Sequence, residues 1–242
     1  KIIINHQHLS FNSEHCFIRI HYFTIPPLTI DYSLFTNALP SSFAHTMNYL
    51  AHAYLSFGLP EITVGNMISD FVKGRKKFDY TPGIQTGISL HRAIDEFTDQ
   101  HPATGAAKKI FQPHYRLYSA AFIDVVYDHF LALDTNEFTE ESLRAFTLQT
   151  FENLTPYHPV FPERFARMFP YMKEQNWLFN YQFRWGLERS FGGLVHRAAY
   201  MEESDTAFRL FEQHYEELKR RYDEFFPEVK SFAFEKLREL QM

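Results

Sequence analysis

Apolar residues recur at intervals of three and four along nearly all of the chain beyond residue 46, the spacing that is typical of helices with one buried face. Glycine and proline punctuate this pattern, because helices often end before Gly and carry Pro in their first turn. The pattern predicts helices over 47–57, 61–72, 82–97, from 102 onward, 119–133 and 140–154. Thr139 is the expected N-cap of the helix that runs to about residue 154.

The last third of the chain is also predicted to be helical. Pro156, Pro159 and Pro162 break it before an aromatic-rich pair of helices, in which Gly192-Gly193 is the weak point. Near the C-terminus, a 3,4,3,4,3 spacing predicts a buried helix face rather than a cofactor site, formed by Phe208, Phe211, Tyr215, Leu218, Tyr222 and Phe225. No alternating pattern indicates strands, so we expect an all-α, single-domain bundle of about eight helices.

The first 46 residues differ from the rest. They contain four charged residues and five histidines, and they follow neither helical nor strand periodicity. They also lack the successive charged and apolar regions of a signal peptide. Because the chain begins with Lys and Met47 opens the patterned part, we expect 1–46 to be an upstream extension or disordered arm outside the catalytic domain, and 47–242 to be that domain. The alternative is an N-terminal arm that packs on the domain.

Composition excludes several classes of protein. The 242 residues are 45% hydrophobic and 22% charged, as in ordinary globular chains, and no apolar run reaches the roughly 18 residues that cross a bilayer. Cys16 is the only cysteine, which excludes an internal disulfide framework and a Cys-rich zinc site. The net charge of −5 argues against a general nucleic-acid binder. We therefore expect a cytoplasmic protein without membrane insertion.

Polar residues at helical spacing concentrate between positions 48 and 129. Four predicted helices each carry such residues inside apolar surroundings, and residues four apart share one helix face. They are Asn48 with His52, Asn66 with Asp70, His91 with Asp95 and Asp99, and Asp124 with Asp128 and the adjacent His129. Gly65 precedes Asn66 and would let another backbone or a ligand approach closely.

The pair Asp124 and Asp128 gives the clearest chemical signal. Carboxylates in an apolar helix are costly to bury unless they are paired or bind a cation. Two of them on one buried face repel each other, and a divalent metal removes that repulsion. Imidazoles and carboxylates without thiolates suit Mn, Fe or Mg better than structural zinc.

Several of these residues also have a purely structural interpretation. Asp99 could cap the helix that follows it, and Asp95 could pair with Arg92 on a solvated face. His129 could be a core histidine as well as a ligand. The two asparagines more often make hydrogen bonds between packed helices than bind ligands.

One basic cluster stands out against the negative net charge, and it consists of Lys73, Arg75, Lys76 and Lys77. Lys108 and Lys109 form a smaller one. Such a run is usually a solvated loop. Its functional interpretation is a docking surface for an acidic partner or a phosphate beside the candidate metal site.

Four stretches of the chain resemble the acyl carrier protein phosphodiesterase family, namely MNYLAHAYL at 47–55, GNMISDFVKG at 65–74, GISLHRAIDEFTD at 87–99 and DVVYDHFL at 124–131. The resemblance extends to about residue 232, and nothing in the family matches 1–46. It implies a helical fold distantly related to HD-type metal phosphohydrolases and a divalent cation, with Mn²⁺ favoured over Mg²⁺ or Fe²⁺. The implied reaction is hydrolysis of the phosphodiester between 4′-phosphopantetheine and a serine of holo-acyl carrier protein.

The resemblance also implies roles for individual residues. The expected metal ligands are His52, Asp70, His91, Asp124 and Asp128, and the expected catalytic residues are Asp70, His91, Asp95, Asp128 and Arg92. We expect supporting roles for Asn48, Asn66, Asp99 and His129. A bound cation would lower the pKa of water from 15.7 to about 7, and Arg92 or Arg75 would offset phosphoryl charge.

The carrier protein that the resemblance implies as substrate is itself acidic, as a family-level expectation. Without 1–46 this chain loses two bases and two acids and keeps its charge of −5, so the two proteins would repel each other. The expected docking face is therefore the basic cluster of Lys73, Arg75, Lys76 and Lys77. Two other functions stay open, an HD-type nucleotide phosphohydrolase and a non-catalytic helical binding module.

Overall fold

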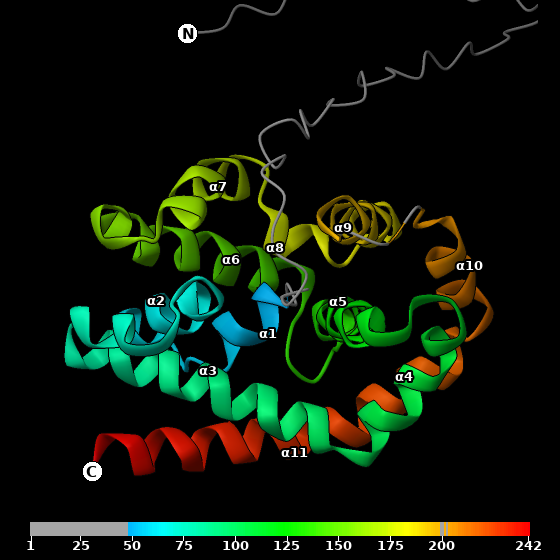
Figure 1. Ribbon diagram of the computed structural model, residues 1–242, viewed down its shortest axis with the longest axis horizontal. Coiled ribbons are helices and arrows are strands. Elements are labelled where there is room, and N and C mark those ends of the chain that lie inside the picture. Colours follow the sequence, from blue (N-terminus) through cyan, green and yellow to red (C-terminus); the bar gives the residue numbers. More distant parts are fainter. Residues whose placement is uncertain (1–47, 199–200, 202) are drawn as a thin grey trace, which may run out of the picture. The chain divides into compact units, whose positions relative to one another are not determined.

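The computed structural model describes residues 48–198, 201 and 203–242, all within one compact unit of the chain. Every regular element in this part is a helix (Figure 1), which confirms the all-α prediction. None of these helices is both long enough and apolar enough to cross a membrane. The predicted extension 1–46 lies outside the described residues, and the HD-type fold remains a prediction.

The described part contains eleven α-helices rather than about eight, because several predicted segments divide into shorter ones. They are α1 (Tyr49–Tyr54), α2 (Pro60–Ile68), α3 (Pro82–Gln100), α4 (Pro102–Tyr115), α5 (Ser119–Leu133), α6 (Glu140–Leu154), α7 (Glu163–Glu174), α8 (Trp177–Asn180), α9 (Arg184–Arg197), α10 (Asp205–Gln213) and α11 (Tyr215–Gln241). Four 3₁₀ segments lie between them: η2 (Ser69–Phe71), η3 (Gly74–Asp79), η4 (Arg116–Tyr118) and η5 (Thr155–Val160).

Local signals account for several helix ends. Thr139 caps α6 as predicted: its hydroxyl accepts from the Ser142 amide at 3.1 Å, and the Ser142 hydroxyl accepts from the Thr139 amide at 2.8 Å. The helix predicted over 47–57 is shorter than expected, and the chain turns through Phe57 and Gly58, whose φ angles are +52° and +73°. The predicted weak point at Gly192-Gly193 does not interrupt α9, because buried side chains on either side hold that helix in the core.

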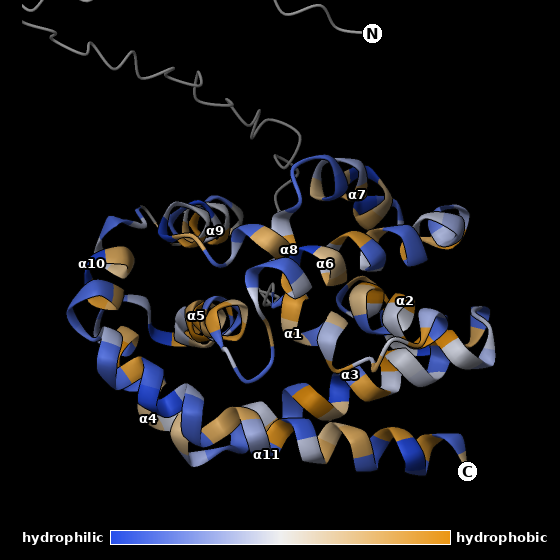
Figure 2. Cartoon of the chain, turned by 180° about the vertical axis from the view of Figure 1, so that it is seen from behind, coloured by the Kyte–Doolittle hydropathy of each residue, from blue (hydrophilic) through white to orange (hydrophobic). Residues whose placement is uncertain are grey.

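The short helix α1 lies between α2 and α5 and packs against both (Figure 1). α5 is buried on nearly all sides, as its apolar sequence predicts, and it is mostly orange in the hydropathy colouring of Figure 2. α11 runs along α3 and α4 and covers the core from the other side. His52 of α1, His91 of α3 and the two aspartates Asp124 and Asp128 of α5 therefore lie buried inside a helical core.

α2 and α3 cross with their backbones in contact. A Cβ atom on Gly65 would lie 2.1 Å from the Ile84 carbonyl oxygen, and one on Gly87 would lie 2.3 Å from the Ile62 carbonyl oxygen. The sequence indicated that Gly65 permits a close approach, and what approaches it is the backbone of α3. Only glycine at both positions lets the two helices pack this closely.

The glycine crossing gives a test of stability. We expect Gly65→Ala to lower the free energy of unfolding by about 3 kcal/mol, because the added methyl group forces α2 and α3 apart. Gly105→Ala is the matched control, since nothing lies within 4 Å of a Cβ there and Ala is the better helix former. Urea unfolding of both variants measures the difference, and equal stabilities would contradict the close crossing.

Candidate metal centre

Two histidine rings and one carboxylate meet between α1 and α3. His52 comes from α1, while His91 and Asp95 lie one turn apart on α3. One ligand atom of each lies within 4.8 Å of the other two. The two imidazole rings are stacked, with centroids 4.0 Å apart and planes inclined by 22°.

Asp95 is shared between the two histidines. Its Oδ1 lies 3.3 Å from His52 Nε2, and its Oδ2 lies 3.1 Å from His91 Nε2. The alternative pairing of Asp95 with Arg92 is therefore not what the structure shows. Arg92 instead donates from Nη2 to the Val72 carbonyl at 2.9 Å.

Asp70 approaches the same site from η2, directly after α2. Its Oδ1 lies 3.1 Å from His91 Nε2. The glycine crossing explains this contact, because Gly87 lies one helical turn before His91 and Gly65 lies five residues before Asp70. The close approach of the two helices thus brings residues 21 positions apart into hydrogen-bonding distance.

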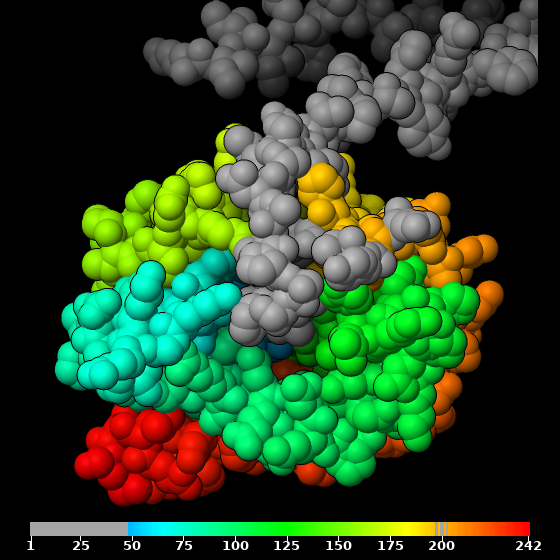
Figure 3. All heavy atoms as spheres, in the orientation of Figure 1, coloured from blue at the N-terminus to red at the C-terminus, as the bar shows by residue number. Residues whose placement is uncertain are grey.

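The site is buried at its histidines and open at its carboxylates. The side chains of His52 and His91 are 2% and 5% exposed, whereas those of Asp70 and Asp95 are 12% and 37% exposed. In Figure 3 the surface is hollowed between the α2–α3 side and the α4–α5 side, and blue atoms of the α1 segment are visible at the bottom of the hollow.

Three imidazole nitrogens of this site lack a hydrogen-bond partner within the described part of the chain. They are Nδ1 and Nε2 of His52, whose Nε2 lacks hydrogen-bonding geometry toward Asp95, and Nδ1 of His91. Buried polar atoms without partners are costly, so unpaired nitrogens beside a carboxylate fit a cation better than an inert core. The nitrogen and oxygen donors present suit a divalent transition metal.

The charges of these residues depend on one another. Burial by itself lowers the pKa of His91, but the charges of Asp95 and Asp70 outweigh it and raise that pKa to about 10. Burial raises the pKa of Asp95, but the charge of His91 at 3.1 Å and the nearby imidazole of His52 outweigh it and bring the pKa below its usual range. Burial and the neighbouring charge of His91 lower the pKa of His52. A proton on His91 therefore neutralises charge that a cation would otherwise neutralise.

Asp124 on α5 faces the same group of charges. Its side chain is buried, and burial, followed by the negative charge of Asp95, raises its pKa well above the usual range. Lys108 acts in the opposite direction, although its ammonium pairs with Asp99 at 2.7 Å. Asp99 does not cap α4; His101 does, accepting from the Ala103 amide at 3.2 Å.

Asp128, one turn further along α5, is bound elsewhere. Its Oδ2 accepts from the Leu50 amide at 3.0 Å and its Oδ1 from the Ala51 amide at 2.8 Å. Burial raises the pKa of Asp128, and the two amides partly offset that shift. Both oxygens of Asp128 thus already have backbone partners. Its role as a metal ligand stays a prediction.

The expected supporting residues have identifiable partners. Asn66 donates from Nδ2 to the His52 carbonyl at 3.0 Å, so it joins α2 to α1. Asn48 is the N-cap residue of α1 but makes no capping bond with its side chain. His129 lies in an aromatic environment, with Nδ1 2.6 Å from the Tyr181 carbonyl oxygen. Asn66 therefore joins two packed helices, as its structural interpretation predicted, and Asn48 only precedes the first residue of α1.

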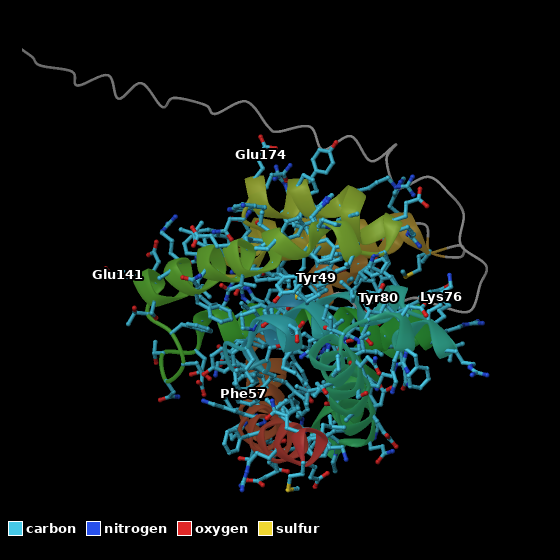
Figure 4. The ribbon with its side chains drawn as sticks, turned by 90° about the vertical axis from the view of Figure 1, so that its left-hand side faces the viewer. Tyr49, Phe57, Lys76, Tyr80, Glu141 and Glu174 are labelled. Atoms are coloured by element: carbon cyan, nitrogen blue, oxygen red, sulfur yellow. The ribbon has the colours of Figure 1, made fainter. Side chains whose placement is uncertain are left out.

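The basic cluster lies on η3 and the residue before it. Arg75 and Lys76 are exposed, and Lys76 points outward from the edge of the molecule in Figure 4. Lys77 is half-buried and donates from Nζ to the Ser89 hydroxyl at 3.3 Å, on the helix of His91. The cluster therefore begins three residues after Asp70 and remains attached to α3.

Sequence reasoning missed the residues that hold α1 from its other end. The Ser56 hydroxyl donates to the His52 carbonyl at 2.8 Å, a bond that the four-residue spacing could have indicated. Tyr54 bonds to Glu137, which also pairs with Lys230 of α11 at 2.6 Å. No local signal in the sequence connects these three residues, because 83 or more positions separate each contact.

Comparison with known proteins covers the part of the chain that contains the candidate metal centre. Residues 47–229 match the profile of the family described as acyl carrier protein phosphodiesterase. The chain belongs to that family. All the residues of the candidate metal centre lie inside the matched range, and no solved structure matches the chain.

Relatives named acyl carrier protein phosphodiesterase match along nearly their whole length. The one from Serratia proteamaculans is 30% identical over 191 residues, which are 78% of this chain and 99% of the relative. Those from Photorhabdus laumondii and Yersinia pestis are 30% and 31% identical over 182 residues, 75% of this chain and 92% and 94% of the relatives. The family membership thus rests on the whole helical unit, and not on one motif.

The raised pKa of His91 predicts a pH dependence of stability in chelator-treated protein. Because the folded pKa is about 10 and the ordinary value is 6.5, this group stabilises the fold fully below pH 6.5 and loses that contribution as the pH rises through 10. Urea unfolding in the presence of EDTA measures this decline in the free energy of unfolding. The pH range, from about 6 to about 10.5, brackets the ordinary and the folded pKa of His91.

His91→Gln is the control for this titration. The raised pKa values of Asp124 and Asp128 give a decline of the same sign, so the part due to His91 is the difference between wild type and the variant. We expect the slope to be shallower in His91→Gln. Identical slopes would show that His91 does not hold its proton in the folded protein.

Proposed function

We propose that this chain hydrolyses the phosphodiester joining 4′-phosphopantetheine to a serine of holo-acyl carrier protein. Water adds to phosphorus, the bond from phosphorus to the serine oxygen breaks, and apo-acyl carrier protein and 4′-phosphopantetheine leave. The observation that carries the proposal is the convergence of His52, His91 and Asp95 in a chain whose named relatives are acyl carrier protein phosphodiesterases. The cytoplasmic location expected from the sequence remains part of this proposal.

We further propose that a divalent cation, with Mn²⁺ favoured over Mg²⁺ or Fe²⁺, is held by His52, His91 and Asp95, with Asp70 and Asp124 beside them. Two imidazoles and several carboxylates without a thiolate suit these metals. When bound, the cation supplies Lewis-acid polarisation of the phosphoryl group and lowers the pKa of a water molecule. These residues are otherwise a poor site for the substrate, because an anionic phosphodiester is repelled by exposed carboxylates.

The protein's own residues fix this arrangement. Asp95 contacts both imidazoles and Asp70 contacts His91, so these contacts fix how each ring is oriented relative to the carboxylates. Asp70 and Asp95 are the more exposed members and form the side that an entering phosphodiester meets. Arg92 is engaged with the Val72 carbonyl, so its first role is to hold the chain after Asp70 against α3.

The docking surface belongs to the same proposal. Arg75 and Lys76 are exposed on η3, a few residues beyond Asp70, and their charge opposes that of the rest of the chain. An acidic carrier protein is attracted to this surface and repelled by most others. A serine held near η3 would place its phosphodiester beside the carboxylates of the site.

Removal of Asp70 tests the catalytic assignment. We expect Asp70→Ala to abolish release of 4′-phosphopantetheine, because it deletes a carboxylate in contact with His91, while the helical circular dichroism persists. Mass spectrometry of holo-acyl carrier protein incubated with each variant and Mn²⁺ measures the release. Asp223→Ala, which removes an exposed aspartate of α11 that pairs with Lys219, should leave turnover unchanged. Normal turnover in Asp70→Ala would refute the assignment.

Charge reversal tests the docking surface. We expect Arg75→Glu with Lys76→Glu to raise KM about tenfold or more at low salt and less at high salt, since rim charges act mainly through screened long-range attraction. The value of kcat should change less than KM, because both side chains are exposed on η3. Arg220→Glu with Arg238→Glu on α11 makes the same change in net charge and is the control. Equal effects of the two pairs would show that only net charge matters.

A further inference from the structure

The helix that carries His52 is too short to be stable alone. α1 has six residues, and isolated helices shorter than about 12 residues are marginal in water. The orientation of His52 therefore depends on contacts that the rest of the molecule makes with α1. Those contacts come from α2, α5, α11, the turn after α1 and the segment between α5 and α6.

The first contact is an N-cap supplied from outside the helix. Asn48 occupies the N-cap position but makes no side-chain bond to the helix amides. The Leu50 and Ala51 amides, at the second and third positions of α1, are those that a capping side chain normally takes. Both are bound by the carboxylate of Asp128, which lies 78 and 77 residues away and is fully buried.

The other contacts hold the middle and the end of α1. The His52 carbonyl accepts from the Ser56 hydroxyl and from Asn66 Nδ2, and Asn66 also donates to the Ser56 hydroxyl at 3.1 Å. Tyr54 bonds to Glu137, and the Lys230 ammonium lies 5.3 Å from the Tyr54 ring centroid. At the N-terminal end of α1, Asp128 supplies the side-chain hydrogen bonds to the Leu50 and Ala51 amides.

We infer that Asp128 is a positioning residue, which orients His52 toward Asp95 and His91 by capping α1 from α5. The inference rests on the metal site proposed above, and it gives Asp128 a role that requires no contact with the cation. The Asp128 side chain is well suited to the task, because it offers two oxygens, and each accepts a hydrogen bond from one of the two amides.

The same arrangement explains why Asp124 and Asp128 differ although they lie one turn apart. Burial, followed by the negative charges of Asp95 and Asp99, raises the pKa of Asp124. Asp128 contacts the backbone of α1. α5 thus contributes one carboxylate to the side of the metal centre and uses the next to hold the helix that brings a histidine there.

The test measures Mn²⁺ binding and amide hydrogen exchange on the full chain carrying Asp128→Ala. Loss of the cap should make exchange at Leu50, Ala51 and His52 about tenfold faster. The Kd for Mn²⁺ should rise about 10- to 100-fold, as for other residues that orient a ligand. Asp128→Asn keeps one acceptor oxygen and should fall between wild type and Asp128→Ala in both measurements.

A matched control separates positioning from general loss of stability. Phe151→Leu removes packing between α6 and α7, where the Phe151 and Phe169 rings are 6.1 Å apart, and α6 carries no residue of the candidate metal centre. It should lower the melting temperature while the Mn²⁺ Kd and the exchange at α1 stay as in wild type. An equal rise in Kd for Phe151→Leu would overturn the positioning role.

The two measurements also separate positioning from direct ligation. If Asp128→Ala weakens Mn²⁺ binding while the α1 amides remain protected, Asp128 is a ligand and the inference is wrong. If neither quantity changes, it is wrong as well. If wild type binds no Mn²⁺, the proposed metal site fails; faster exchange in Asp128→Ala then still supports the cap on α1, and unchanged exchange overturns it.

Discussion

Acidic side chains inside a helical core must each find a partner, and this requirement organises the site and the helices around it. Asp95 is shared by two imidazoles, Asp70 contacts one of them, and Asp128 accepts from two backbone amides. Each partner comes from another element, so satisfying these charges fixes α1, η2, α3 and α5 relative to one another. Because a buried charge without a partner is costly, these pairings hold the four elements in one defined arrangement.

Much of the fold could be predicted from local patterns. α5 and α6 have the predicted bounds, because an unbroken apolar helix and a capping box are both local signals. The pairing of residues four apart also indicated the members of the site. His52, Asp70, His91 and Asp95 come together, since each helix presents one polar face to the same interior.

What the sequence could not supply is the partner of each polar residue across the fold. Asp124 and Asp128 share a helix face, yet α1 begins beside only one of them, and nothing in the local sequence indicates where α1 begins in space. Arg92 donates to the Val72 carbonyl, a partner that the local sequence did not indicate, because the turn after α2 brings that carbonyl to α3. The end of α1 similarly depends on the left-handed backbone angles of Phe57 and Gly58, which the sequence of this pair did not indicate.

The residues from Asp70 to Asp79 form one continuous segment, which is held to α3 by the Arg92–Val72 and Lys77–Ser89 hydrogen bonds. It carries a carboxylate of the candidate metal centre at one end and exposed cations of the basic cluster further along. In the proposed function, binding of the partner protein and catalysis therefore depend on the same short segment. On that proposal, an insertion or loop exchange in this stretch would change both the docking surface and the position of a carboxylate of the metal centre.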